Sequence, residues 1–227
     1  MAQVWHDLLF VHWPVDAELL RPRLPPGVEL DLFDGQAWLG VVPFRMSRIR
    51  ARGLLPLPGL SASPEVNVRT YAAAGGRPGV FFLSLDAARR LFVAGARRFF
   101  HLPYWRANMT CRREADRLSY SSIRVAGRRA AAAEFRAAYG PTGPVHPARA
   151  GRLDHWLTER YCLYTADRAG RPLRVDILHD PWPLQPAWAR IEANTMAEAA
   201  GVGLPMAQPL LHFSRRVDVV VWPPRRI

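Results

Sequence analysis

Polar and apolar side chains alternate along the segment 65–71, which reads Glu-Val-Asn-Val-Arg-Thr-Tyr. Successive side chains of a β-strand point to opposite faces, so a strand here would carry one chemically distinct face. The residues on that face would be Glu65, Asn67, Arg69 and Tyr71. A guanidinium can bind a carboxylate through two parallel hydrogen bonds, and a neighbouring acid can accept from a hydroxyl or act as a base. One interpretation of the pattern is the polar wall of a sheet-enclosed cavity that binds a small-molecule ligand, a carboxylate.

The same alternation has a second interpretation, in which the polar face meets water. A cross-strand ion pair that used Glu65 or Arg69 would then add little to stability, because exposed pairs contribute about 0–1 kcal/mol. The two interpretations differ in the burial of this face.

The chain contains no lysine, since all 31 of its Lys and Arg residues are arginine. A Walker-type phosphate loop requires a lysine that contacts the β- and γ-phosphates. Schiff-base chemistry requires a primary amine, which only the α-amino group of Met1 could supply here. The sequence also lacks the H-E-x-x-H, G-x-S-x-G and EF-hand motifs and a G-x-G-x-x-G after a strand. The familiar hydrolase, nucleotide and calcium signatures are therefore missing.

Candidate metal ligands are few. Cys111 and Cys162 stand alone without C-x-x-C spacing, so we expect two reduced thiols. His6 and His12 would share one face of a strand, as a pair of metal ligands or as ordinary hydrogen-bonded imidazoles. We expect no metal and no cofactor.

The formal net charge of +12 raises the question of nucleic-acid binding. The arginines come as scattered pairs rather than one basic arm, which fits a codon bias toward arginine, and nucleic acid stays a minor alternative. No apolar run approaches the roughly 18 residues that would span a bilayer, and no export signal is evident at the N-terminus. We expect a single domain over residues 1–227, in the cytoplasm and without a membrane partner.

The hydrophobic pattern predicts a strand-rich α+β fold with a large, mostly antiparallel sheet. Strands are expected over 28–32, 37–46, 65–71, 80–85, 104–113, 118–125, 130–139, 161–165, 173–178, 187–192 and within 210–222. The Pro- and Gly-rich stretch 54–64 is typical of a surface loop.

Helices are predicted to be short. One follows Asp16 and another covers 153–157. Asp86 is expected to cap a third, amphipathic helix that packs on the sheet. Its apolar stripe is Ala88, Leu91, Phe92, Gly95 and Phe99.

Several stretches resemble the DUF2071 (YqjF-like) family over nearly the whole chain. They include LLFVHWPVDAELLRPRLPPGVELDLFDGQAWLGVVPFRM, EVNVRTY, GVFFLSLDAARRLFVAGARRFFHLPYWRANM and LTERYCLYT. That family is in turn similar to the acetoacetate decarboxylase superfamily. The resemblance implies a curved sheet that closes into a barrel or cone around an internal cavity, with a few short helices.

The second resemblance rests on Glu65-x-Asn67 and on Gly95-Ala96-Arg97 followed by Leu102-Pro103-Tyr104-Trp105-Arg106-Ala107, which is similar to the decarboxylase stretch G-R-E…P-K-K-x-A. Tyr104 then stands where the decarboxylase has its Schiff-base lysine. In a chain without lysine this excludes amine-dependent decarboxylation. A phenol can instead donate a hydrogen bond to a developing enolate oxygen.

The resemblance implies catalytic roles for Glu65 as acid or base and for Tyr104 as oxyanion donor. Arg69 would bind the ligand carboxylate, Asn67 would orient the ligand, and Arg97 would make a second anion contact. The alternatives are a Tyr104–Glu65 bond in an inherited pocket without activity, and an Arg97 that only meets solvent.

Three functions stay open. The first is a lyase-like or hydratase-like enzyme that acts on a small organic acid, the second a non-catalytic binding or sensing module, and the third a basic nucleic-acid-binding protein. A homodimer through an exposed strand edge is also open.

Overall fold

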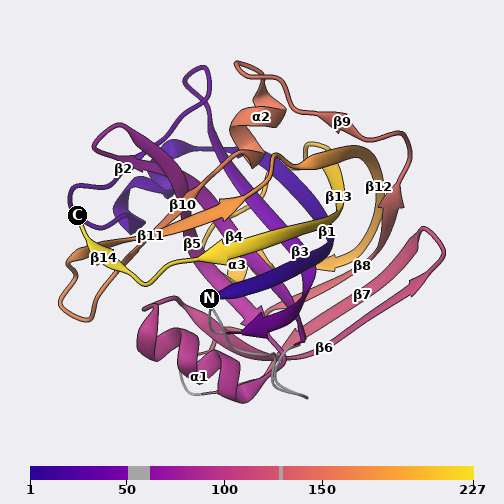
Figure 1. The fold of residues 1–227 in the computed structure, drawn as a ribbon, viewed down its shortest axis with the longest axis horizontal. Coiled ribbons are helices and arrows are strands. Elements are labelled where there is room, and N and C mark those ends of the chain that lie inside the picture. Colours follow the sequence, from indigo (N-terminus) through magenta and orange to yellow (C-terminus); the bar gives the residue numbers. More distant parts are fainter. Residues whose placement is uncertain (51–61, 128–129) are drawn as a thin grey trace.

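Most of the chain extends as β-strands, as its alternating pattern predicts. The computed structural model describes residues 1–50, 62–127 and 130–227 (Figure 1). The described strands are β1 (Ala2–Val15), β2 (Glu29–Leu30), β3 (Ala37–Arg50), β4 (Ser63–Ala74), β5 (Arg77–Ala87), β6 (Tyr104–Glu114), β7 (Arg117–Arg124), β8 (Glu134–Pro141), β9 (His146–Pro147), β10 (Cys162–Ala166), β11 (Pro172–His179), β12 (Pro183–Asn194), β13 (Leu210–Val221) and β14 (Arg225–Arg226).

The helices in the described residues are short and few. They are α1 (Arg90–Phe99), α2 (Leu153–Thr158), α3 (Met196–Ala199) and the 3₁₀ turns η1 (Ala17–Leu19) and η2 (Arg21–Arg23). Asp16 caps η1 by accepting a 2.9 Å hydrogen bond from the Glu18 amide. None of the helices in the described residues is long and apolar enough to cross a membrane.

The strands form a single, strongly curved sheet in the order β14-β11-β10-β5-β6-β7-β8-β12-β13-β1-β3-β4-β2 (Figure 1). Two further pairings join β4 to β5 and β11 to β13, and β9 pairs with β12. Nearly all neighbours are antiparallel, and β5 runs parallel to β10 and β6. Parallel neighbours need a crossover, and α1 provides it between β5 and β6. The predicted α+β class with a mostly antiparallel sheet is confirmed.

Both faces of β1, β3 and β4 are covered by apolar cores. Leu8, Val42 and Phe44 belong to the core on one face. Val66 and Val68 belong to the core on the other. The alternation predicted for β4 is therefore real, and both of its faces are buried.

The helix predicted after Asp86 differs from the expectation. Asp86 is not its cap, because β5 continues through Ala87 and α1 begins only at Arg90, without a side-chain cap at Arg89. Asp86 is instead fully buried and binds Arg124 of β7 at 2.7 Å. A buried acid opposite a guanidinium is held in the sheet, so it cannot reach the first turn of the helix.

The predicted apolar stripe of α1 is only partly correct. Ala88 lies outside the helix, and Leu91 is 69% exposed. Phe92, Gly95 and Phe99 line a pocket, although Phe99 is also 67% exposed. The helix lines a pocket with part of its apolar surface, and another part of that surface meets water.

Three further expectations concern a loop, a strand and the two cysteines. Most of the loop predicted over 54–64 lies outside the described residues, and its last two positions already belong to β4. The strand expected from residue 130 starts at Glu134. Cys111 and Cys162 are both free thiols, as predicted.

Candidate functional site

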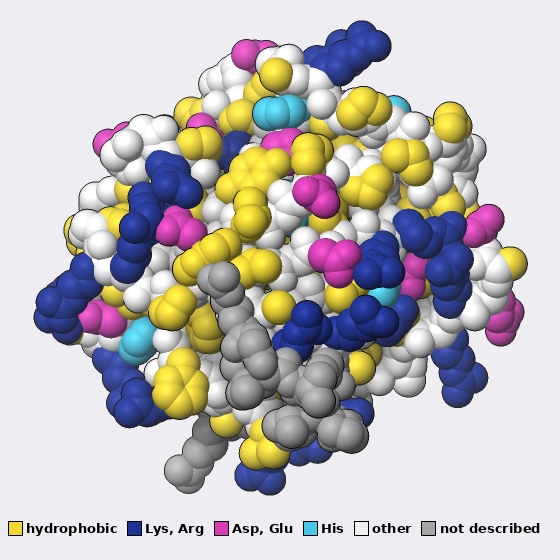
Figure 2. Space-filling model, in the orientation of Figure 1, with side chains coloured by type: hydrophobic (Ala, Val, Ile, Leu, Met, Phe, Trp, Pro, Cys, Tyr) yellow, Lys and Arg dark blue, Asp and Glu magenta, His cyan; other side chains and the backbone are white. Residues whose placement is uncertain are grey.

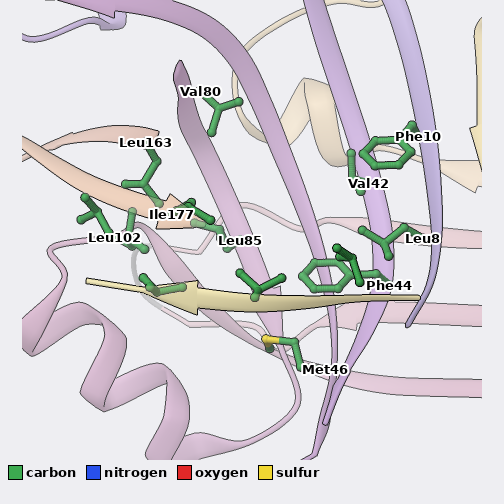
Figure 3. Close-up of a cluster of buried hydrophobic side chains, with 14 of the residues drawn as sticks. Leu8, Phe10, Val42, Phe44, Met46, Val80, Leu85, Leu102, Leu163 and Ile177 are labelled. Carbon is green, nitrogen blue, oxygen red and sulfur yellow. The ribbon is translucent and has the colours of Figure 1, made fainter. Parts of the chain in front are cut away.

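A pocket of about 270 Å³ lies between α1 and the face of the sheet that carries Glu65, Asn67 and Arg69. Its lining comes from strands far apart in sequence, including β1, β3, β4, β5, β10 and β11. Figure 3 shows the apolar side chains around it, several of which point toward one another from different strands; those that line the pocket are Leu8, Val42, Phe44, Met46, Leu85, Leu102, Leu163 and Ile177. The curvature of the sheet brings these strands together.

The polar face of β4 is buried in this pocket. Glu65, Asn67 and Arg69 are 3%, 4% and 8% exposed. The solvent-facing interpretation of the segment 65–71 is therefore wrong. Tyr71 shares the face, but it lies deeper, fully buried, and does not line the pocket.

Strand register explains how Tyr104 reaches the same pocket. Leu85 of β5 pairs with Asn67 of β4 on one side and with Tyr104 of β6 on the other. Residues opposite each other in neighbouring strands point to the same face. The Tyr104 hydroxyl donates a 2.6 Å hydrogen bond to Oε2 of Glu65.

Glu65 and Tyr104 form a coupled pair with perturbed acidity. Burial raises the pKa of Glu65 to about 7, while hydrogen bonds with Tyr104 and Asn67 hold it from rising further. Burial and the adjacent Glu65 raise the pKa of Tyr104 well above its usual value. Near neutral pH Glu65 can therefore exchange a proton, and Tyr104 keeps its own.

Arg69 is a buried cation in the pocket that lacks an acidic partner among the described residues. Its side chain lies 5.3 Å from the ring centre of Phe10 and 5.9 Å from that of Tyr71. It is hydrogen-bonded to the Tyr71 side chain, and its hydrogen bond to the Leu157 carbonyl is long at 3.5 Å. Its Nε has no partner, and no acid among the described residues forms an ion pair with it. A buried charge without a counter-ion destabilises the protein, so an anion bound beside this guanidinium would be stabilising.

Neighbouring strands shape the space around Arg69. Gly40 of β3 pairs with Arg69 on one side and with His12 of β1 on the other. A Cβ on Gly40 would lie 3.0 Å from the His12 ring and 3.4 Å from Cγ of Arg69, so only glycine leaves both side chains in place. His12 bonds the Tyr71 hydroxyl at 2.7 Å. Burial and the Arg69 charge lower the pKa of His12 well below its usual value, which leaves it neutral.

Arg97 is not brought to the pocket. Its Nε donates a 2.5 Å hydrogen bond to the Tyr104 carbonyl, its guanidinium lies 5.0 Å from the Trp105 ring centre, and it is absent from the pocket lining. Arg97 therefore supports the backbone of Tyr104 from outside.

Other residues of the site were not predicted from the sequence. Gln3 lines the pocket, and Tyr120 donates a 2.6 Å hydrogen bond to the backbone carbonyl of Glu65. On β1 the facing residues change from Gln3 and Trp5 to Leu8, because Asp7 has a φ of 56° and interrupts the alternation. A strict period of two along β1 therefore could not have predicted both Gln3 and Leu8 as pocket residues.

No group of His, Cys, Asp and Glu in the described ranges is arranged to hold a metal ion. His6 and His12, considered above as a pair of metal ligands, each have a separate hydrogen-bond partner. His6 bonds the Ser47 hydroxyl at 2.7 Å, and His12 bonds Tyr71.

Comparison with known proteins identifies the family of this chain. The family model DUF2071, described as an uncharacterized conserved protein, matches residues 2–218. The chain belongs to the DUF2071 family. It is also 47% identical over 226 residues to the uncharacterized protein YqjF of Bacillus subtilis (strain 168), which covers 100% of this chain and 92% of YqjF.

Solved structures similar to this DUF2071 protein share its fold at low sequence identity. A structure of the enduracididine biosynthesis enzyme MppR with HEPES bound has a TM-score of 0.67 at 14% identity, covering 100% of this chain and 87% of MppR. Acetoacetate decarboxylase from Legionella pneumophila has a TM-score of 0.64 at 15% identity, covering 98% and 86%. The predicted resemblance to the acetoacetate decarboxylase fold is confirmed, and these likenesses show the fold alone.

Proposed function

We propose that this DUF2071 protein binds a small organic acid in the pocket of β4, with the ligand carboxylate on Arg69. The observation that carries the proposal is a guanidinium that is 8% exposed and has no acidic partner among the described residues. A ligand carboxylate would supply the missing counter-charge and occupy the unpaired Nε. The additional pairings of β4 with β5 and of β11 with β13 support a sheet that closes as a cone around this ligand.

Glu65 and Tyr104 give the bound acid a route to proton-transfer chemistry. Glu65 in its carboxylate form would take a proton from a carbon next to a carbonyl, and the Tyr104 hydroxyl would turn from Glu65 to the enolate oxygen that develops. This is the first half of a lyase or hydratase reaction. It needs no amine, in keeping with a chain that has no lysine.

Ligand binding can be tested by thermal unfolding with butyrate, lactate and pyruvate as probes; pyruvate is the ligand in one structure of MppR. A probe at a hundredfold excess over its Kd adds about 2.7 kcal/mol, which corresponds to a rise in Tm of roughly 5–10 °C. Arg69→Met removes the charge with little change in volume and should abolish the rise. Arg112→Ala removes an exposed arginine of β6 and should keep it.

A rise that survives in Arg69→Met, or no rise with any acid, would overturn the proposal. Folding of Arg69→Met is checked by circular dichroism. It should be at least as stable as the wild type without ligand, because the substitution removes an unpaired buried charge.

Catalysis is tested separately from binding, by hydrogen–deuterium exchange at C3 of 2-oxobutyrate in D₂O, followed by NMR. Glu65→Gln keeps the shape of the side chain but cannot accept the proton, so exchange should stop while binding persists. Binding without exchange in the wild type would instead support the non-catalytic binding or sensing module.

A further inference from the structure

Most of the polar side chains of the pocket lie on one strand, β4. Five of its 22 lining residues carry polar side chains, and three of these, Glu65, Asn67 and Arg69, lie on β4. The hydroxyl of Tyr104 already donates a 2.6 Å hydrogen bond to Glu65. Gln3, the fifth, accepts a 3.0 Å hydrogen bond from the Trp5 indole through its side-chain oxygen. Asn67 is hydrogen-bonded to Glu65. Met1 also lines the pocket, and its α-ammonium group donates a 2.6 Å hydrogen bond to the Val221 carbonyl. Arg69 is therefore the one cationic side chain among the described residues that line the pocket.

The remaining wall is apolar and reaches from the sheet to α1. Phe82 and Leu85 of β5, Leu102 before β6, and Phe92 and Phe100 at the helix face the same space. A second charged or heavily hydroxylated group of a ligand would lie against these side chains and would lose its hydration without any replacement hydrogen bond.

Phe99 marks where the pocket meets solvent. It lines the pocket and is nevertheless 67% exposed. Arg69, by contrast, is only 8% exposed and lies beside Phe10, Tyr71 and the Leu157 carbonyl, so it lies further from solvent than Phe99. A ligand whose carboxylate rests on Arg69 thus has its far end beside α1.

The volume limits the size of the ligand. About 270 Å³ holds about nine water-sized groups at roughly 30 Å³ each. A carboxylate with an unbranched chain of medium length fills this space, whereas acetate leaves most of the apolar wall uncovered.

We infer that the ligand is a monocarboxylic acid with an apolar body of medium length, its head on Arg69 and its tail between the sheet and α1, past Phe99. This inference rests on the proposed binding of an acid by Arg69 and names the class of acid. It excludes dicarboxylates and sugar acids as preferred ligands.

Isothermal titration with acetate, butyrate, hexanoate and octanoate tests the class. Each methylene that enters the pocket should tighten binding about fourfold, which corresponds to about 0.8 kcal/mol, up to the length that fills it. Adipate matches hexanoate in length but carries a second carboxylate at its tail, and it should bind at least about tenfold more weakly.

The position of the tail is tested on α1 with a matched pair of variants. Phe99→Ala should weaken octanoate several-fold and leave butyrate unchanged. Leu91→Ala removes a side chain that is as exposed, at 69% against 67%, but does not line the pocket, and it should change neither.

The outcomes separate this inference from the function on which it rests. Affinity that depends on Arg69 but not on chain length, or adipate that binds as tightly as hexanoate, would overturn the apolar body and leave acid binding intact. Failure of every acid to bind, or 1-hexanol that binds as tightly as hexanoate, would overturn the carboxylate anchor and with it the inference.

Discussion

Glu65 combines burial with a titration near neutral pH, and this makes its contribution to stability depend on pH. Its pKa is about 7 in the folded protein against 4.5 for the free side chain. The folded state therefore holds this proton more tightly, so the free energy of unfolding falls as pH rises from about 4.5 to about 7. At 1.36 kcal/mol per pKa unit, the loss is about 3 kcal/mol.

Glu65→Gln should remove this dependence. In urea unfolding experiments, the free energy of unfolding of the variant minus that of the wild type should grow by about 3 kcal/mol from about pH 4 to about pH 8. Glu114→Gln, at the exposed end of β6, is the control and should show a constant difference. A constant difference for Glu65→Gln as well would mean that its carboxyl titrates alike in the folded and unfolded chain.

Sequence alternation found Glu65, Asn67 and Arg69 because β4 pairs with β3 without a register shift, although its pairing with β5 shifts between Val68 and Arg69. The same pattern could not decide between burial and exposure, since that depends on which strands the sheet brings opposite β4. The family resemblance supplied Tyr104, and register then explained its contact with Glu65. The sequence offered no sign that Arg69 would lack an acidic partner, because partners of buried charges come from distant strands.

At the scale of elements, three adjacent strands hold the arginine. Gly40 of β3 lies between His12 of β1 and Arg69 of β4, and an added Cβ would press on both. Gly40→Ala should destabilise the protein by about 1–3 kcal/mol, as overpacking of a core does, and weaken butyrate several-fold by displacing Arg69. Gly95→Ala, which lines the same pocket but meets nothing within 4 Å, is the control for the loss of stability. Full butyrate affinity in Gly40→Ala would show that β3 does not position the guanidinium.

The buried ion pair between Asp86 and Arg124 joins β5 to β7 across β6. Both side chains are at most 2% exposed, and Arg124 also lies 5.3 Å from the ring centre of Trp105 of β6. Removing only the acid leaves the guanidinium buried without a partner, so Asp86→Ala should cost about 3–5 kcal/mol in chemical unfolding.

The double variant Asp86→Ala/Arg124→Met distinguishes this cause from simple loss of packing. It should recover much of the stability, because no unpaired charge remains. A double variant as unstable as Asp86→Ala would assign the loss to the cavity instead. The pair also explains why the predicted helix cap failed: an acid before a helical pattern is typical of a cap, but its true partner lies 38 residues away in sequence.

Most strand segments were predictable because local alternation and turn residues determine them, although β1 was considered only as a strand that would carry His6 and His12. The order in which the strands pair was not, since β1 pairs with β13 across most of the chain and β5 pairs with β10, which follows it only after several other elements. The pocket depends on that order. Its apolar wall combines strands that no local pattern relates, so the sequence alone could predict a polar face but not what closes over it.

At the scale of the whole molecule, the net charge of +12 must be weighed against where the charges lie. Figure 2 shows arginines spread over the visible face with acidic side chains among them. Several are paired, for example Arg215 with Asp116 at 2.6 Å and Arg225 with Asp176 at 2.7 Å. Such a surface attracts polyanions only through screened, exposed charges, whereas Arg69 acts inside the pocket.

Salt therefore separates binding in the pocket from binding to nucleic acid. Between about 50 mM and about 200 mM NaCl, binding of a random-sequence DNA duplex should weaken at least tenfold, because counterions released from the phosphates oppose it. The affinity for hexanoate should change less than about twofold, since a buried ion pair is little screened. Both are measured on the same protein, by fluorescence anisotropy and by calorimetry. Tight DNA binding that persists at the higher salt would favour a nucleic-acid function, and hexanoate affinity that falls as steeply as that for DNA would place the acid on the surface rather than on Arg69.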